Sequence, residues 1–259
     1  MYGGAGCGAL SGRPEQVIVL AIYLPELSKH DVSFPKLHHA LTEPDGLLAM
    51  GGDLSAERLI SAYSSGIFPW FSEGDPLLWW SPSVRAIFPP DTLTLNRTLK
   101  KQVRRYKLHF SVNTAFAAVT KHCAAPRARQ PGTWILPQMQ QAYLQLHHRG
   151  YAHSIEVWQQ DKLVGGLYGV MIGQLFCGES MFNLLPDTAK IALVVLQYHL
   201  KTVAEGWIDC QLPNPFLQQM GVQSIPREEY TSLLQQLKHK AVVKSHWQAG
   251  TIAHDIADA

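Results

Sequence analysis

The 259-residue chain lacks the short motifs that most often mark metal, nucleotide and redox sites. Its four cysteines (Cys7, Cys123, Cys177 and Cys210) form no CxxC pair and follow no regular spacing. This argues against a zinc site or a disulfide framework and fits a reducing compartment. The twelve histidines include no HExxH, and the glycines form neither GxxxxGK[ST] nor GxGxxG. We therefore expect no metal site and no phosphate-binding loop.

The chain also lacks a long hydrophobic run and a strong excess of one charge. The apolar run at 17–23 is too short to span a membrane, and no basic segment or clear cleavage site accompanies it. The formal net charge of +2 demands no polyanionic partner, although a local cluster of charge could still bind one. With 46% apolar and 16% charged residues, the composition is that of a soluble globular protein of one large or two small domains.

The stretch 154–182 predicts three short strands, at 154–159, 163–171 and 175–182, separated by turns. The Gly165-Gly166 pair inside the second strand predicts a bulge, or a close approach by a ligand or another part of the chain. Glu179 and Ser180 put polar groups into the apolar third strand. Although a carboxylate on a strand is often only a partner for an arginine or a backbone amide, Glu179 is the first candidate for a functional site.

The remaining pattern predicts an α+β fold. Residues 108–119 suggest a strand entering a helix, and 207–212 suggest another strand. Helices are expected at 56–64, 96–106, 137–149, 188–205 and 227–239. This order describes a central mixed sheet, the layout of N-acetyltransferase-like (GNAT-like) folds. We expect a disordered extension at 1–21, a small N-terminal α+β domain at 22–84, a GNAT-like catalytic domain at 85–245 and a flexible tail at 246–259.

A second carboxylate stands in the segment WIDCQL at 207–212. Because side chains alternate along a strand, Asp209 and Gln211 should share one face, which the predicted layout brings near Glu179. Apolar neighbours would disfavour the charged form of Asp209 unless Gln211 or a bound cation stabilises it. Such a carboxylate could hold or deprotonate an amine. Cys177 and Cys210 should point to the opposite, buried face, as inert thiols.

Two further features suggest nucleic acid. The first is the helix 96–106, whose five cations recur at spacings of three and four with no acid among them: Arg97, Lys100, Lys101, Arg104 and Arg105. They could form a solvated face, or bind phosphates and so relieve their mutual repulsion. The second is a group of aromatics at 70–80, namely Trp70, Phe71, Trp79 and Trp80. These could form a small core that holds a loop, or a surface on which a base stacks.

Several long segments together resemble the leucyl/phenylalanyl-tRNA–protein transferase family. They are LLAMGGDLS at 47–55, GIFPWF at 66–71, LWWSP at 78–82, GTWI at 132–135, AHSIEVW at 152–158, LVGGLYGV at 163–170, LFCGESMF at 175–182 and IDCQ at 208–211. The resemblance covers about residues 25–240. It implies a cytoplasmic bacterial enzyme, expected to be a monomer, that moves Leu or Phe, and weakly Met, from aminoacyl-tRNA to the N-terminal Arg or Lys of a protein and marks it for degradation. It implies no metal and no organic cofactor.

The resemblance also implies roles for individual residues. Glu179 would hold the aminoacyl end, Asp209 would engage the α-amine of the acceptor, and Gln211 would orient Asp209. The five cations of the helix 96–106 would grip the phosphates of the acceptor stem. Two tryptophans, Trp70 and Trp134, would enclose the 3′-terminal adenosine. The pocket for the transferred side chain would be lined by Leu167, Phe176, Leu196 and Leu200, and substrate binding would also involve Ser180 and Asn214.

The chain departs from the family pattern at two places. Leu167, Leu196 and Leu200 stand where some relatives have Met or Phe, which could shift the preference between Leu and Phe. Pro215-Phe216 follow Asn214 where many relatives have a histidine. Two other functions remain open: a non-catalytic tRNA-binding protein in which Asp209 is structural, and an acetyl-CoA-dependent acetyltransferase, although the expected R/QxxGxG/A loop is absent from the sequence.

Overall fold

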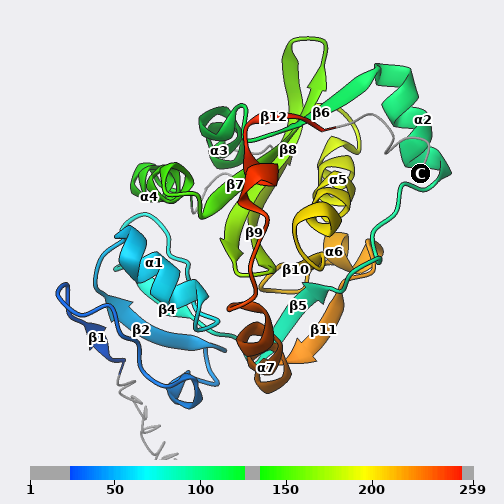
Figure 1. The fold of residues 1–259 in the computed structure, drawn as a ribbon. Coiled ribbons are helices and arrows are strands. Elements are labelled where there is room, and N and C mark those ends of the chain that lie inside the picture. The colour runs from blue at the N-terminus through cyan, green and yellow to red at the C-terminus, as the bar shows by residue number, and fades with distance from the viewer. Residues whose placement is uncertain (1–23, 126–134, 253–259) are drawn as a thin grey trace, which may run out of the picture.

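The computed structural model describes residues 24–125 and 135–252. The expected extension at 1–21 and the expected adenosine contact Trp134 lie outside the described residues. The described chain forms two mixed sheets with helices packed on them, and the N-terminal residues build the smaller sheet (Figure 1).

The smaller sheet has four strands in the order β1-β2-β4-β3. They are β1 (Glu26–Leu27), β2 (Leu47–Gly51), β3 (Phe68–Pro69) and β4 (Leu78–Trp80). Between β2 and β3 the chain forms helix α1 (Ala56–Tyr63), which begins where the Ser55 hydroxyl accepts a hydrogen bond from the Arg58 amide. Leu59, Ala62 and Tyr63 of α1 are buried, so the helix fixes the smaller sheet against the rest of the protein.

The larger sheet has eight strands in the order β11-β5-β10-β9-β8-β7-β6-β12. Their bounds are β5 (Val84–Phe88), β6 (Leu108–Val112), β7 (Ala152–Gln159), β8 (Lys162–Ile172), β9 (Leu175–Asn183), β10 (Trp207–Asp209), β11 (Gln223–Pro226) and β12 (Gly250–Ile252). Neighbouring strands are antiparallel except for β9 and β10, which pair directly and in parallel. A helix connects these two strands in the sequence. The expected neighbours, the strand before the buried helix and the strand after it, therefore do lie side by side.

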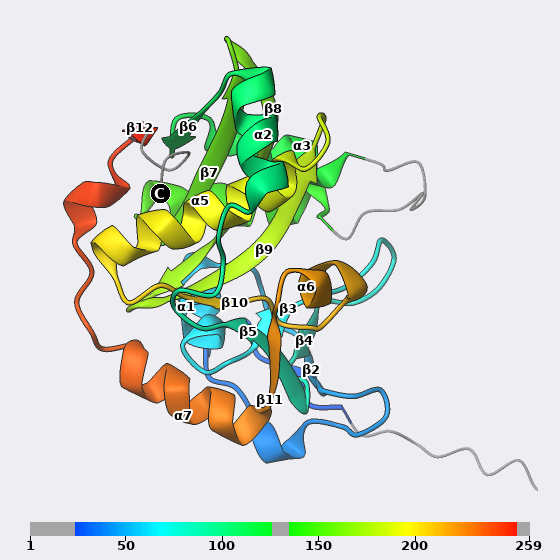
Figure 2. The ribbon, with the colours of Figure 1, turned by 90° about the vertical axis from the view of Figure 1, so that its right-hand side faces the viewer.

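Helices cover both faces of the larger sheet. Their bounds are α2 (Arg97–Tyr106), α3 (Phe116–Ala124), α4 (Pro137–His148), α5 (Thr188–Val203), α6 (Pro215–Gln219) and α7 (Arg227–Leu237). One hydrophobic core joins one face of the sheet to α1, α3, α4 and α7. A second core lies under α2, α5 and α6 on the other face (Figure 2). The apolar composition of α5 follows from this position, since twelve of its residues are buried.

All five predicted helices are present, each within two residues of its expected ends. Two predictions are wrong. The strand expected at 207–212 ends at Asp209, because Gln211 has a left-handed backbone with φ of +56°. The expected flexible tail at 246–259 is also wrong in its described part, because Gly250–Ile252 pairs with β6 as β12. The strands β5 and β11 and the helix α6 were not predicted.

The glycine pair of β8 lies at a bulge, as the sequence suggested. Val157 of β7 faces Gly165 and Trp158 faces Leu163, so Val164 is one residue too many for regular pairing. A Cβ atom on Gly165 would come within 2.5 Å of the Thr188 side chain. The same position thus combines a bulge with a close approach by α5.

A second bulge lies in β9. Tyr168 of β8 faces Ser180 and Gly169 faces Gly178, which leaves Glu179 as the extra residue. The bulge reverses the alternation of side chains along the strand. Phe176 and Met181 consequently contact the same core although they are five residues apart. Glu179 is therefore the bulge residue of β9.

Candidate functional site

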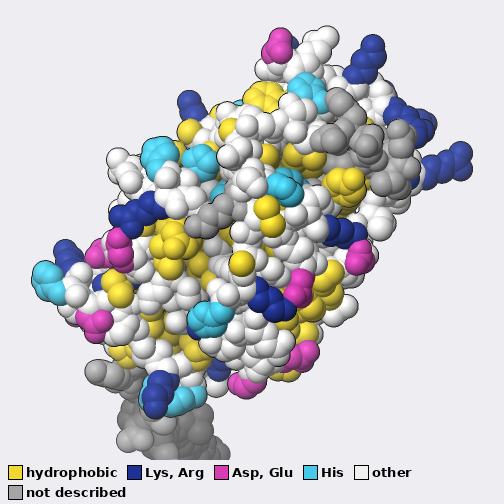
Figure 3. All heavy atoms as spheres, in the orientation of Figure 1, with side chains coloured by type: hydrophobic (Ala, Val, Ile, Leu, Met, Phe, Trp, Pro, Cys, Tyr) yellow, Lys and Arg dark blue, Asp and Glu magenta, His cyan; other side chains and the backbone are white. Residues whose placement is uncertain are grey.

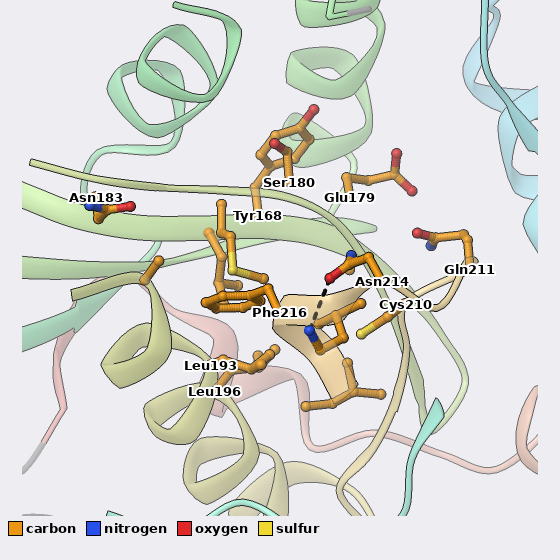
Figure 4. Close-up of a pocket in the computed structure, with 16 residues that line it drawn as sticks. Tyr168, Glu179, Ser180, Asn183, Leu193, Leu196, Cys210, Gln211, Asn214 and Phe216 are labelled. Carbon is orange, nitrogen blue, oxygen red and sulfur yellow. Dashed lines mark hydrogen bonds between the residues drawn. The ribbon is translucent and has the colours of Figure 1, made fainter. Parts of the chain in front are cut away.

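A cavity of about 420 Å³ opens where β9 and β10 stop pairing. The last paired residues are Asp209 and Cys177, and β9 then continues alone on this side to Asn183. The cavity lies between this part of β9, the N-terminal half of α5 and the helix α6 (Figure 4). Its lining is Leu167, Tyr168, Gly178, Glu179, Ser180, Met181, Asn183, Ala189, Leu193, Leu196, Ile208, Cys210, Gln211, Asn214, Phe216 and Leu217.

The lining divides into an apolar and a polar part. The apolar part includes Leu193 and Leu196 of α5 and Phe216 of α6, which lie together on one side in Figure 4. The polar part includes Glu179 and Gln211, whose side-chain ends face each other across the other end of the cavity in the same view. The site can hold an apolar group at one end and bring its polar end to a carboxylate and an amide.

Two tyrosines hold the Glu179 carboxyl group. The Tyr63 hydroxyl donates to Oε1 at 2.6 Å and the Tyr143 hydroxyl donates to Oε2 at 2.7 Å. The two hydroxyl groups are also 2.7 Å apart. Tyr63 comes from α1 and Tyr143 from α4, so the N-terminal part of the chain helps to build the site.

The environment raises the pKa of Glu179 to about 7, from the 4.5 of an ordinary glutamate. Desolvation by the surrounding side chains is the largest cause, and the nearby charge of Asp209 adds to it. The hydrogen bonds from Tyr143 and Tyr63 favour the ionised carboxylate and so limit the rise. The carboxyl group is therefore close to half ionised at neutral pH.

Asp209 occupies a different environment, since it is completely buried beneath the cavity. Its Oδ1 accepts from Arg85 Nε at 2.8 Å and its Oδ2 accepts from Arg85 Nη2 at 2.8 Å. The Tyr230 hydroxyl donates to Oδ2 at 3.1 Å. Direct contact between Asp209 and an amine, the role expected for it, does not fit this arrangement, because its carboxylate is enclosed and already paired.

Gln211 connects Asp209 to the cavity. Its backbone N–H donates to Asp209 Oδ1 at 2.9 Å, while its side chain lines the cavity. Among the described residues, nothing accepts a hydrogen bond from its buried Nε2 atom. The sequence predicted that Asp209 and Gln211 share one face of a strand. Instead, the chain turns at Gln211, which has a positive φ, and this turn brings the Gln211 N–H to the Asp209 carboxylate. Asp209 thus fixes the backbone that carries the Gln211 amide.

The residues expected to line the cavity divide into two groups. Leu167, Leu196, Ser180 and Asn214 do line it. Phe176 and Leu200 are completely buried in the core under α5 and are not part of the lining. Asn214 also begins α6, where its Oδ1 accepts from the Leu217 amide at 2.9 Å (Figure 4).

The two cysteines near the site are protonated thiols. Cys177 is completely buried, and desolvation raises the pKa of its thiol well above the usual value. Cys210 lines the cavity, which corrects the expectation that it points away. Burial raises the pKa of the Cys210 thiol as well, so neither sulfur provides a thiolate nucleophile.

The predicted basic helix is α2. Asn96 caps it by accepting from the Leu99 amide at 3.0 Å, and Leu99 and Val103 face the core. The five cations lie on its other side and line one hollow of the surface together with Leu95. In Figure 3, lysine and arginine side chains gather at the end of the molecule where Figure 1 shows α2. The expected arrangement of cations on a single face is present.

The aromatic group at 70–80 divides into buried and exposed rings. Phe71 and Trp79 are buried, and the Trp79 indole donates to the Gly51 carbonyl at 3.0 Å. Trp70 is 42% exposed and its ring centroid lies 5.7 Å from that of Trp80. Two aromatics therefore hold the loop, while Trp70 presents a ring to the outside.

Four residues of the site were missed from the sequence. Tyr63 and Tyr143 bond Glu179, while Arg85 and Tyr230 bond Asp209. Tyr63 and Tyr143 stood in the sequence only as apolar positions of amphipathic helices. An arginine partner was considered for Glu179 as a carboxylate on a strand. Such a partner is present at the other carboxylate instead, since Arg85 pairs with Asp209.

The described part of the chain was also searched for metal ligands and for membrane-spanning helices. No three His, Cys, Asp or Glu side chains in it are grouped so that they could hold a metal ion. None of its helices is both long and apolar enough to cross a membrane.

Comparisons with known proteins give a consistent result. Residues 87–235 match the family model described as leucyl/phenylalanyl-tRNA protein transferase, and residues 52–83 match the model of its N-terminal domain. The chain is similar to leucyl/phenylalanyl-tRNA–protein transferases from Shewanella piezotolerans (50% identity over 86% of this chain and 95% of the relative) and Shewanella pealeana (48% over 90% and 99%). The corresponding protein of Psychromonas ingrahamii is 48% identical over 90% of this chain and 98% of its own length.

Proposed function

Since the chain belongs to the leucyl/phenylalanyl-tRNA–protein transferase family and is therefore an aminoacyltransferase, we propose that it moves leucine or phenylalanine, and methionine more weakly, from aminoacyl-tRNA to the N-terminal arginine or lysine of acceptor proteins. The observation that carries this proposal is the cavity itself. It is apolar at one end and carries Glu179 and Gln211 at the other. An aminoacyl ester has the same division between side chain and reacting group.

The apolar end suits the transferred side chain. Leu167, Leu193 and Leu196 have no polar group with which to bind a charged or amide-bearing side chain, and burying one there would cost the desolvation of its polar atoms. Between apolar side chains that differ by one methylene, discrimination amounts to only about 1–3 kcal/mol. Leucine and phenylalanine are thus favoured, and some transfer of methionine is expected.

The reaction requires little from the enzyme beyond position and a free amine. An aminoacyl ester is already activated, so no nucleophile from the protein is needed. Gln211 meets the reacting groups through its unpaired amide, and Asp209 acts as a positioning residue by holding the Gln211 backbone. Glu179 lies opposite and contacts the aminoacyl end. Ser180 and Asn214 supply further polar contacts in the cavity.

The tRNA is bound outside the cavity. The five cations of α2 contact phosphates of the acceptor stem, which gives affinity without reading sequence. Trp70 offers an exposed ring on which the terminal adenosine stacks. No metal and no organic cofactor takes part in this proposal.

The wider setting belongs to the same proposal. The larger sheet is GNAT-like, a description supported by the two parallel strands β9 and β10, whose pairing ends at Cys177 and Asp209, next to the bulge in β9. The N-terminal domain comprises 22–84 and the catalytic domain 85–245. The enzyme acts in the cytoplasm as a monomer, and the added leucine or phenylalanine marks the acceptor for degradation.

A transfer assay tests the proposal. The protein is incubated with tRNA charged with labelled leucine and a peptide with N-terminal arginine, and label is expected on the peptide's α-nitrogen. The same peptide with an acetylated N-terminus, or with N-terminal glutamate, should stay unlabelled. Absence of label from the free arginine peptide would contradict the proposal. Acetylation of that peptide from acetyl-CoA would point to the acetyltransferase instead.

A further inference from the structure

We propose that Glu179 is the general base of the transfer, the group that takes the proton from the acceptor's α-amine as its nitrogen attacks the ester carbonyl. The inference rests on the proposed function and adds a catalytic role to a residue expected only to hold the aminoacyl end. It follows from comparing the two carboxylates near the cavity, Glu179 and Asp209.

Only one of these carboxylates can reach a substrate. Asp209 is 0% exposed, and its two oxygens are taken by Arg85, Tyr230 and the Gln211 amide. Protonating it would leave the buried Arg85 guanidinium without its counter-charge, which is costly. Glu179 lines the cavity and has no ion-pair partner among the described residues. Of the two, Glu179 is the carboxylate that can both touch an amine and accept its proton.

The bulge places Glu179 for this task. As the extra residue of β9, it points toward Gln211 rather than following the regular alternation of the strand (Figure 4). Each of its oxygens receives one tyrosine hydroxyl, which fixes the orientation of the carboxylate. An ionised carboxylate can accept about four hydrogen bonds, so capacity for an amine remains.

Every charged or titratable group around Glu179 bears on its proton. Tyr63 from α1 and Tyr143 from α4 donate to it and lower its pKa, and Arg85 from β5 lowers it further through its charge. Desolvation and Asp209 from β10 raise it, and the resulting pKa is about 7. Tyr168 from β8 and Cys177 from β9 stay protonated, because burial raises their pKa values. The charge of Glu179 raises both further, and that of Asp209 also raises the pKa of Cys177. A base with a pKa near neutral pH combines the ionised form with useful basicity.

The step balances with Glu179 alone as proton carrier. The neutral α-amine attacks the ester carbonyl carbon, and the new C–N bond forms while one N–H proton passes to a Glu179 oxygen. The tetrahedral intermediate then collapses. The bond from carbon to the ribose oxygen breaks, and this oxygen takes the proton from Glu179. The products are a peptide bond and a free ribose hydroxyl, and the carboxylate is regenerated.

The decisive variant is Glu179→Gln, which keeps the size and polarity of the side chain but cannot accept the proton. We expect kcat to fall by about 10²–10⁴-fold, with the KM for aminoacyl-tRNA changed little. The wild-type profile of kcat against pH should rise with a midpoint near 7, and this rise should be absent from the variant. A matched control is Glu205→Gln, an exposed glutamate that pairs with Lys240. It should behave as wild type.

The acceptor amine also loses a proton near this pH range, so a second test separates the two titrations. Tyr63→Phe removes one hydrogen bond to the ionised carboxylate, and the midpoint should therefore move to higher pH with the same acceptor. Acceptor peptides whose α-amines differ in pKa should leave the Glu179 midpoint in place. Thermal unfolding of each variant shows whether it is folded.

Two results would overturn the inference while leaving the proposed function intact: a folded Glu179→Gln enzyme with wild-type kcat, or one whose main change is a higher KM, as expected of a residue that only holds the substrate. If the wild-type protein transfers no leucine at all, the proposed function fails instead.

Discussion

The guanidinium group of Arg85 meets both carboxylate oxygens of Asp209 at 2.8 Å, although the two residues stand 124 positions apart. The pair is buried where β5 and β10 run side by side. It ties β5 to β10, the strand that leads into the turn at Gln211. Asp209 is thus a structural anchor of the site.

Breaking this pair should destabilise the protein strongly. Asp209→Asn leaves the Arg85 guanidinium buried without a counter-charge, and we expect the free energy of unfolding to fall by about 3–5 kcal/mol. Urea unfolding at neutral pH measures the change. The exposed pair between Asp91 and Lys201 is the control, since Asp91→Asn should change stability little. An Asp209→Asn protein as stable as wild type would show that the pair is not an anchor.

Glu179 should make stability depend on pH in an unusual direction. Its pKa is about 7 in the folded protein and near 4.5 in the unfolded chain, so the folded state binds the proton more tightly. The stabilisation is complete below about pH 4.5 and is lost as the pH rises through about 7. The full loss amounts to roughly 3–4 kcal/mol. In Glu179→Gln this loss disappears.

The measurement compares wild type and Glu179→Gln by urea unfolding at pH 5 and pH 8. We expect the variant to gain stability relative to wild type as the pH rises. Equal pH dependence in the two proteins would show that the Glu179 pKa is not raised. A gain at pH 8 would also mean that the ionised carboxylate is kept at the expense of stability, as is common for functional groups.

The basic helix should determine how tRNA binding depends on salt. Replacing Lys101 and Arg105 by alanine should weaken binding, and should reduce the slope of log affinity against log salt by about 1 for each phosphate contact removed. The control is Lys162→Ala, an exposed lysine at the β7–β8 turn. Filter binding between 50 and 200 mM salt gives the slope. An unchanged slope would exclude α2 from the tRNA interface.

The end of the cavity should determine which amino acid is transferred. Leu196→Phe adds bulk to the apolar wall, and should lower phenylalanine transfer more than leucine transfer because the larger ring no longer fits. We expect the ratio of the two kcat/KM values to change by about 10–200-fold. Phe176→Leu, in the core below the cavity, is the comparison and should change the ratio less. If Phe176→Leu changed this ratio more than Leu196→Phe, the transferred side chain would bind elsewhere than in this cavity.

The C-terminal segment should make the protein sensitive to acid. Trp247 stacks on His153 with centroids 4.0 Å apart and meets the edge of His199 at 4.8 Å. Burial lowers the pKa of His153 to about 3 and that of His199 to about 4. Because both values lie below the 6.5 of a free histidine, stability is present above about pH 6.5 and lost as the pH falls toward 4.

We expect His199→Leu to remove part of this acid sensitivity, since leucine has no charge to gain. Unfolding free energies between pH 7 and pH 4.5 measure the effect. His239→Leu, an exposed histidine after α7, serves as the control. A variant with the same acid dependence as wild type would contradict the assignment to His199.

The helices other than α6, and the strands β6 to β9, could be predicted because their signals are local. Periodic apolar residues, caps and turn glycines lie within the elements themselves. The strand β5 could not be predicted in this way. It has five residues, is followed by Pro89-Pro90, and contains an arginine that looks exposed in sequence. Arg85 can be buried there only because Asp209 arrives from a distant strand.

The candidate site shows the same limit. Both carboxylates and Gln211 could be predicted, but not which carboxylate would be accessible. That difference depends on Arg85 for Asp209 and on Tyr63 and Tyr143 for Glu179, and none of these contacts is local. The positive φ of Gln211 likewise broke the strand alternation on which the prediction depended.

The bulge in β9 makes the site sensitive to chain length in a way that substitutions are not. Since Glu179 is one residue too many for regular pairing, deleting a single residue from 177–181 would let β9 and β8 pair without interruption. Deleting Glu179 itself would keep every other cross-strand partner, since Ser180 already faces Tyr168 and Gly178 already faces Gly169. Loss of that one codon would therefore leave a folded, regular sheet with the cavity wall in place and the carboxylate missing.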